Sequence, residues 1–174
     1  MADRSPLITA TPADIPAIMA LERGPDFESL VGRWPAAEHG AEMAKAGSRY
    51  FLWSPGGSAL GFALIQNLDT RHDAGYLKRI AVAEPGKGVG GLLLEAILDR
   101  LFTAGINRVS LNVFPENERA VRAYRRLGFE IEGLCRENYR QPDGAYRSSL
   151  LMAILRQDWP GRHSRHEKTG SSTP

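Results

Sequence analysis

A glycine-rich turn between two regular segments constrains the fold of this chain more than any other feature. The turn spans residues 84–91 and reads Glu-Pro-Gly-Lys-Gly-Val-Gly-Gly. It follows a strand-like segment, 75–83, and leads into 88–104, where apolar residues recur at helical spacing. Gly105 ends this helix, and a β-rich segment, 106–114, comes next. A strand, helix and strand in this order favour a parallel strand pair with a right-handed crossover.

The remaining segments add strands and helices around this centre. We predict flanking strands at 6–10, 49–53, 59–66, 129–136 and 146–155, and flanking helices after the cap Thr11-Pro12, at 36–46 and at 117–127. Residues 51–68 carry no charge, but Ser54-Pro55-Gly56-Gly57 in their middle favours a hairpin over a membrane span. The expected order is β-α-α-β-β-β-α-β-α-β-β, a mixed sheet flanked by helices.

Length and charge fit a single domain. The 174 residues suit one core, and we predict one domain over 1–159 followed by a disordered polar tail over 160–174. The tail holds three Lys or Arg and one Glu, which together equal the formal charge of +2 of the whole chain. The predicted domain is therefore formally neutral, which disfavours nucleic acid as a partner.

The cysteine content and the N-terminal residues indicate a compartment. The single cysteine, Cys135, cannot form an intramolecular disulfide and lacks the paired spacing of a zinc site, so we expect no metal. Residues 1–10 carry an acid and a base before any apolar run, unlike a secretory signal. These features predict a reducing, cytoplasmic location without membrane association.

The glycine turn taken alone leaves its ligand open. Glycines permit a tight turn and let a phosphate approach the N–H groups of the following helix. A Walker motif is excluded because its Gly-Lys pair is followed by glycine instead of Ser or Thr. Gly86, Gly88 and Gly91 match a dinucleotide fingerprint, but the next strand ends at Asn112-Val113 without the acid that such a site needs. A turn that binds nothing also fits.

Two motifs follow one another along the chain. The first is the glycine turn with Ile80-Ala81-Val82 before it and Leu92-Leu93-Leu94 after it. The second is Asn117-x-x-Ala120-x-x-x-Tyr124-x-x-x-Gly128-Phe129. In this order the two motifs resemble those of the GNAT superfamily of acyl-CoA N-acetyltransferases. The resemblance covers residues 5–156, and residues 136–152 are similar to the corresponding segment of members that acetylate protein N-termini or small amines. It implies an α/β (α+β) fold with a mixed, mostly antiparallel sheet of six to seven strands and about four helices.

The resemblance also implies a ligand and its contacts. Acetyl-CoA would be the co-substrate, and the acceptor would be a primary amine, on a protein N-terminus or a small molecule, that attacks directly. Either a monomer or a homodimer is expected. The cofactor-binding residues implied are Ile80, Ala81, Val82, Gly86, Lys87, Gly88, Val89, Gly90, Gly91, Asn112, Asn117, Arg119 and Tyr124. Arg122 and Arg125 are alternatives to Arg119 for the nucleotide's 3′-phosphate, and a solvated helix face explains all three equally well.

The catalytic residues are predicted in part from the resemblance. Tyr124 stands where the family places the acid that protonates the departing thiolate, and with a reference pKa of about 10 it holds its proton at neutral pH. Packing of Tyr124 on Phe129 is the alternative. Members that act on ribosomal-protein alanine carry a glutamate base where this chain has Asn112, which cannot accept a proton. The predicted base is therefore Glu84, ranked ahead of Glu116, Asp69, His72 and Asp73.

Further departures from the family pattern keep a second function open. Pro85 stands where an Arg or Gln is usual, in a turn two residues shorter than usual, and Ser148 stands where relatives carry Asp. The alternative to an enzyme is a non-catalytic acyl-CoA-binding sensor or a degenerate family member; a dinucleotide-dependent oxidoreductase is disfavoured by the short chain after the crossover. Residues 27–34, Tyr139 and Tyr146 are expected to shape the acceptor pocket.

Overall fold

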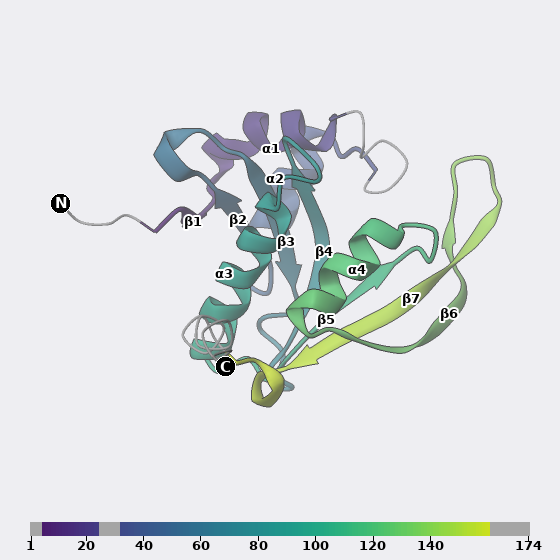
Figure 1. Cartoon of the computed structure of the whole chain (residues 1–174). Coiled ribbons are helices and arrows are strands. Elements are labelled where there is room, and N and C mark those ends of the chain that lie inside the picture. The colour runs from purple at the N-terminus through teal and green to yellow at the C-terminus, as the bar shows by residue number, and fades with distance from the viewer. Residues whose placement is uncertain (1–4, 25–31, 161–174) are drawn as a thin grey trace, which may run out of the picture.

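The computed structural model describes residues 5–24 and 32–160, and within these ranges it has one seven-stranded sheet and four α-helices (Figure 1). The elements are β1 (Leu7–Thr9), α1 (Ile15–Glu22), α2 (Ala36–Met43), β2 (Arg49–Trp53), β3 (Gly61–Gln66), β4 (Ala74–Val82), α3 (Val89–Thr103), β5 (Arg108–Val113), α4 (Glu118–Leu127), β6 (Glu130–Arg140) and β7 (Tyr146–Leu155). Short 3₁₀ turns lie at Pro12–Asp14, Pro55–Gly57 and Arg156–Asp158. The predicted order of elements is confirmed.

The sheet is mixed and mostly antiparallel, as predicted. Its strand order is β1-β2-β3-β4-β5-β7-β6, and β4 and β5 form its parallel pair. The α3 crossover joins these two strands, which confirms the expected β–α–β centre. β2 and β3 form the predicted hairpin, so the uncharged run 51–68 lies in the sheet. In the described ranges, no helix is both long and apolar enough to cross a bilayer.

Helices cover both faces of the sheet. On one face, α3 packs on apolar side chains that include Ala63 and Ile65, and Figure 1 shows α4 on this same side. On the other face, α1 packs on a separate group that includes Phe62 and Leu64. Successive residues of β3 serve opposite faces because side chains alternate along a strand. β2 and β3 are therefore apolar on both faces, over 50–53 and 61–65, which explains the uncharged run.

A bulge in β4 changes which face its side chains meet. Leu77 pairs with Ile65 and Arg79 pairs with Leu64, so Lys78 is an extra residue between them. Two residues apart in a regular strand would share a face. Here Leu77 packs in the α3-side core, whereas Arg79 turns to the side of α1 and α2.

The pairing of β4 with β5 stops next to this bulge. The parallel register runs from Ala74 opposite Arg108 to Leu77 opposite Leu111 and goes no further. Residues 78–82 therefore continue along β3 while they leave β5. This separation places a gap in the middle of the sheet, between strands that are paired at their other ends.

Three predicted details differ from the structure or lie outside it. The helix predicted over 36–46 ends at Met43, and Gly47 lies beyond it, where the Asp69 carboxylate would overlap a Cβ at that position. The strand predicted to end at residue 136 extends to Arg140, because its polar end still pairs with β7. Residues 27–31 and the predicted tail beyond Pro160 lie outside the described residues, so those predictions and the domain boundary stay predictions.

A matched pair of glycine substitutions tests the backbone of this fold. Gly128 caps α4 at φ +101°, and an added Cβ would lie 3.2 Å from Ile154 Cδ1. We expect Gly128→Ala to lower the free energy of unfolding by about 1–2 kcal/mol because L-residues disfavour this conformation. Gly40 lies within α2 with nothing near its Cβ position, so Gly40→Ala should raise stability by about 0.5–1 kcal/mol. Urea denaturation measures both, and equal effects would contradict the assigned conformations.

Candidate active site

A groove lies where β4 separates from β5. Its volume of about 480 Å³ is in the range of small-molecule sites. All the predicted cofactor-binding residues line it except Lys87 and Val89. Lys87 is exposed on the turn, and Val89 packs against the apolar cores. Residues distant in the sequence thus meet at one place: Ile80, Ala81, Val82, Gly86, Gly88, Gly90, Gly91, Asn112, Asn117, Arg119 and Tyr124.

One wall of the groove is the backbone of β4. Residues 79–82 pair with β3 on one side, and within the described ranges residues 78–82 have no strand partner on the side of β5. Such an edge presents N–H and C=O groups in alternation. An extended ligand with amide groups can bind there as an added strand.

The glycine turn forms an anion cradle at one end. Gly86 and Gly88 both adopt φ +84°, and α3 begins directly after them. The first helix hydrogen bond runs from Leu92 N–H to Gly88 C=O at 3.1 Å, so the N–H groups of residues 89–91 have no helical acceptor. These donors and the positive end of the helix dipole attract a phosphate.

Cationic side chains also line the groove. They are Lys78, Arg79, Arg119 and Arg126, whereas Arg122 and Arg125 do not belong to the lining. Arg122 is exposed and pairs with Glu118 at 3.0 Å. Of the three predicted partners for a 3′-phosphate, the structure therefore places Arg119 at the groove, and it adds Arg126.

Helix α4 contributes its cap and a tyrosine to the groove. Asn117 is the N-cap, as predicted, and its Oδ1 accepts from Ala120 N–H at 3.2 Å. Tyr124 lines the groove and also packs against Phe129, with ring centroids 5.7 Å apart. Burial raises the pKa of Tyr124 to about 12. The phenol is therefore a neutral proton donor over the whole range in which proteins usually work.

A chain of neutral polar side chains lies at the other face of the gap. Because side chains alternate along β5, Asn112 points away from its neighbours Leu111 and Val113 in the α3-side core. Asn112 Oδ1 accepts from Tyr76 O–H at 3.1 Å, and Asn112 Nδ2 donates to Ser149 Oγ at 2.9 Å. Ser149 in turn donates to Asn138 Oδ1 at 3.0 Å.

The sequence prediction missed three members of this chain, which also line the groove: Tyr76, Asn138 and Ser149. A signal exists for Ser149, since it is a polar residue at the buried start of an apolar strand. No comparable signal marks Asn138, because its position depends on the register between β6 and β7. Of the residues expected to shape an acceptor pocket, Tyr139 lines the groove, whereas Tyr146 and the described residues 32–34 do not.

The predicted bases do not gather at the groove. None of them belongs to its lining: Glu84, Glu116, Asp69, His72 and Asp73. Glu84 is exposed on the glycine turn. Glu116 pairs with Arg147 at 3.1 Å, and a backbone hydrogen bond together with this arginine lowers the pKa of Glu116. Within residues 5–24 and 32–160, no Asp, Glu or His lines the groove, and no cluster of three metal-ligating side chains occurs.

Comparisons with known proteins agree with this geometry. Residues 16–129 match the acetyltransferase (GNAT) family. The chain is 34% identical over 149 residues to the uncharacterized protein ML0378 of Mycobacterium leprae, which covers 83% of this chain and 40% of that protein. It is 34% identical over 110 residues to the N-alpha-acetyltransferase RimI of Mycobacterium tuberculosis, which covers 62% of this chain and 68% of that protein. The chain thus spans less than half of the first relative.

A solved structure shares the fold. The spermidine N-acetyltransferase of Vibrio cholerae in complex with CoA and spermine superposes with a TM-score of 0.75 at 23% identity, over 87% of this chain and 95% of that one. At this identity the likeness concerns the architecture of the chain.

Removing one hydroxyl tests the polar chain at the groove. Ser149→Ala should lower the free energy of unfolding by about 1–3 kcal/mol, because it takes a partner from both Asn112 and Asn138 in a buried place. Ser58→Ala is the control, since Ser58 is exposed and should change stability by less than about 0.5 kcal/mol. Thermal and urea unfolding measure the two variants, and a Ser149→Ala protein as stable as the control would contradict the assigned contacts.

Proposed function

The chain belongs to the acetyltransferase (GNAT) family, and we propose that it transfers an acetyl group from acetyl-CoA to a primary amine on a protein N-terminus or a small molecule. The observation that carries this proposal is the groove at the break between β4 and β5, with an anion cradle at one end and Tyr124 in its wall. No other described feature joins a phosphate site, an open strand edge and a proton donor in one cavity.

The residues present fit the parts of acetyl-CoA. The N–H groups at 86–91 suit the pyrophosphate, and Arg119 or Arg126 suits the 3′-phosphate. The free edge at 78–82 suits the amides of the pantetheine arm. Pro85 also lines the groove but offers no side-chain donor, so the backbone of the turn carries the pyrophosphate contact.

The reaction follows from this placement. The neutral amine nitrogen attacks the thioester carbon, and the new C–N bond forms a tetrahedral oxyanion. An N–H group of β4 can stabilise this oxyanion, an effect worth about 3 kcal/mol per donor in other acyl transfers. The nitrogen gives up its extra proton to solvent, the C–S bond breaks, Tyr124 donates its proton to the departing thiolate, and the amide product and CoA leave. Solvent restores the proton of Tyr124.

The acceptor enters, in this proposal, from the face of α1 and α2. The cradle and Tyr124 belong to the face of α3 and α4, whereas the chain Tyr76–Asn112–Ser149 lies across the sheet from them. No Asp, Glu or His lines the described groove. The acceptor, which is an ammonium ion in solution, therefore loses a proton to water before it attacks. Glu84 is exposed outside the lining and would have to act through intervening water, so its role as base stays a prediction.

Charge narrows the class of acceptor. The described lining carries Lys78, Arg79, Arg119 and Arg126 and no acid, so it offers no carboxylate to pair with an acceptor that has several positive charges. A peptide α-amine is therefore the better candidate than a polyamine, in accord with the name of the RimI relative. A cytoplasmic location, supported by the unpaired Cys135, is part of the proposal, and monomer against homodimer stays a prediction.

Binding and transfer test the proposal directly. Acetyl-CoA at a hundred times its Kd should add about 2.7 kcal/mol of apparent stability, measured by thermal shift, while NADH at the same concentration should add none. Mass spectrometry then follows acetylation of a peptide with a free N-terminal alanine and of spermidine, with the peptide expected as the better substrate. An unchanged Tm at millimolar acetyl-CoA would contradict the proposal. Binding without transfer to any amine supports the non-catalytic sensor instead.

Removing the phenol of Tyr124 tests the acid. Tyr124→Phe should lower kcat by about 10²- to 10⁴-fold and leave the Kd of acetyl-CoA within twofold, because the ring still packs on Phe129. The control Tyr146→Phe alters an exposed residue outside the lining and should change neither value. An unchanged kcat in Tyr124→Phe would reduce Tyr124 to a packing residue.

The pH profile provides a second check of the same assignment. Because the raised pKa of Tyr124, about 12, keeps the phenol protonated, kcat/KM should rise to the pKa of the acceptor, about 8 for a peptide α-amine, and stay level to pH 10. Glu84→Gln should leave this profile unchanged. A fall to half by pH 10 would contradict the raised pKa of Tyr124, because that is the profile of an acid with the ordinary tyrosine pKa of about 10. A shifted rising limb in Glu84→Gln would restore Glu84 as the base.

A further inference from the structure

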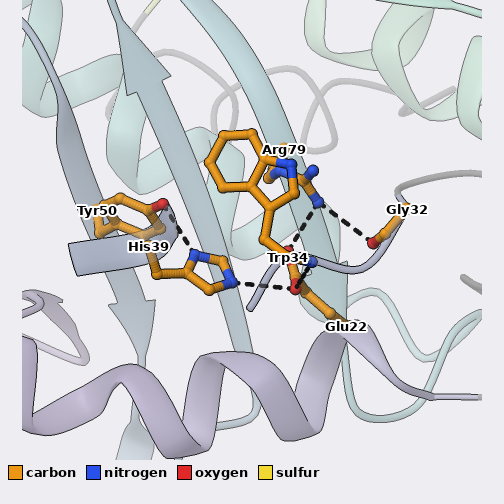
Figure 2. A network of polar contacts seen from close by, with 6 residues as sticks. All are labelled: Glu22, Gly32, Trp34, His39, Tyr50 and Arg79. Carbon is orange, nitrogen blue, oxygen red and sulfur yellow. Dashed lines mark hydrogen bonds and ion pairs between the residues drawn. The ribbon is translucent and has the colours of Figure 1, made fainter. Parts of the chain in front are cut away.

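A buried cluster of charged and aromatic side chains on the face of α1 and α2 has no part in the reaction described above. Glu22 of α1 is 1% exposed, His39 of α2 is 0% exposed and Arg79 of β4 is 7% exposed. Figure 2 shows these side chains converging with Trp34 and Tyr50 between the helices and the sheet. Burying charged side chains costs free energy, so the presence of this cluster calls for an explanation.

Arg79 is the centre of this cluster. Its Nη1 donates to Glu22 Oε1 at 2.8 Å and to the carbonyl oxygen of Gly32 at 3.3 Å. The guanidinium carbon lies 3.8 Å from the centroid of the Trp34 ring, in cation–π contact. Arg79 therefore holds two points of the short segment 32–34, which leads into α2.

Glu22 holds the same segment from the other side. Its Oε2 accepts from the backbone N–H of Trp34 at 3.3 Å and lies 3.1 Å from His39 Nε2. Because a carboxylate only accepts, His39 donates through Nε2, and its Nδ1 accepts from Tyr50 O–H at 2.9 Å. The ion pair and its partners thus connect α1, α2, β2 and β4 around Trp34, as Figure 2 shows.

Stability alone does not require charges here. Two apolar residues of similar volume can replace a buried ion pair at no cost in stability. An apolar pair cannot make directional contacts, whereas a guanidinium can contact a carboxylate, a carbonyl oxygen and an aromatic face at the same time. The bulge at Lys78 is what turns Arg79 toward these partners.

Arg79 also lines the groove. It lies on the strand that carries the free edge, and it faces the same side of the sheet as Asn112 and Ser149, where the acceptor is proposed to enter. Segment 32–34 is therefore tied to the acceptor side of the groove through one side chain, whereas the anion cradle lies on the opposite face.

We propose that Arg79 is a positioning residue that, through Glu22, fixes segment 32–34 beside the acceptor end of the groove and so sets the affinity for the acceptor amine. This inference rests on the proposed acetyl transfer. It assigns Arg79 no role in binding acetyl-CoA through its side chain, and none in the proton transfers.

The test separates positioning from stability with a double variant. Arg79→Met alone leaves the buried Glu22 carboxylate without its cation, so we expect a lower Tm. Arg79→Met combined with Glu22→Leu removes both charges and should recover part of that Tm, because the N–H groups of Trp34 and His39 still lose their acceptor. In the double variant we still expect the KM for the N-terminal alanine peptide to rise at least tenfold, with kcat within threefold and the Kd of acetyl-CoA within twofold of wild type.

Two further variants complete the design. Arg108→Met with Glu132→Leu makes the same substitutions at an ion pair on the surface, between β5 and β6, and should leave the KM unchanged. Arg79→Lys keeps the charge without the planar fork and should give an intermediate KM. If the double variant does not fold, Trp34→Leu, which leaves both charges in place, is expected to raise the KM for the peptide in its stead.

The outcomes distinguish this inference from the proposed function. A double variant that regains part of its Tm with a wild-type KM would overturn the positioning role, as would an unchanged KM in Trp34→Leu. Hydrogen exchange at the Trp34 amide gives a readout without turnover: it should speed up at least tenfold in the double variant, and unchanged exchange also overturns the inference. A wild-type protein that binds acetyl-CoA but acetylates nothing overturns the proposed function, whatever the exchange shows.

Discussion

The end of the hydrogen-bonded pairing between β4 and β5 is the constraint on which the site depends. The two strands pair in parallel from Ala74 to Leu77, and the bulge at Lys78 coincides with the place where they part. Past this point β4 keeps its bonds to β3 and exposes its other edge within the body of the protein. An open edge is usually a liability that proteins cover or shorten; here it is the wall of the groove that a ligand with amides can complete.

The two faces of the sheet supply different chemistry to that groove. On the side of α3 and α4 it meets the positive end of a helix, cationic side chains and a phenol whose pKa burial has raised to about 12. On the side of α1 and α2 it meets neutral amides and hydroxyls hydrogen-bonded in series, together with Arg79, whose charge is paired with Glu22. A cofactor rich in phosphate and an amine that must be neutral to attack need such unlike surroundings, and the sheet keeps them apart.

Local sequence patterns predict the helices, the strands and the glycine turn. The placement of other groove residues depends on the register between strands, which local patterns do not reveal. Glycines that need positive φ, the Asn117 cap and the helical spacing of α3 each depend on a few neighbouring residues, so they predict the turn and both crossover strands. The prediction of Tyr124 rests instead on the resemblance to the family. Arg79 escaped because a one-residue bulge, invisible in composition, decides which face it meets. Asn138 escaped because β6 continues through polar residues on the strength of its pairing with β7. Glu84 was favoured by proximity along the chain, but its side chain is exposed outside the lining.

The separate cores on the two faces have a consequence for how such a protein can change. The residues that pack α1 on the sheet are nearly all distinct from those that pack α3. The sheet therefore separates two hydrophobic cores. Substitutions that remodel the core of α1 and α2 can alter which molecule is admitted while the opposite core keeps its shape. Related chains can therefore evolve new substrate preferences through substitutions on the face of α1 and α2, while the residues on the face of α3 and α4 stay the same.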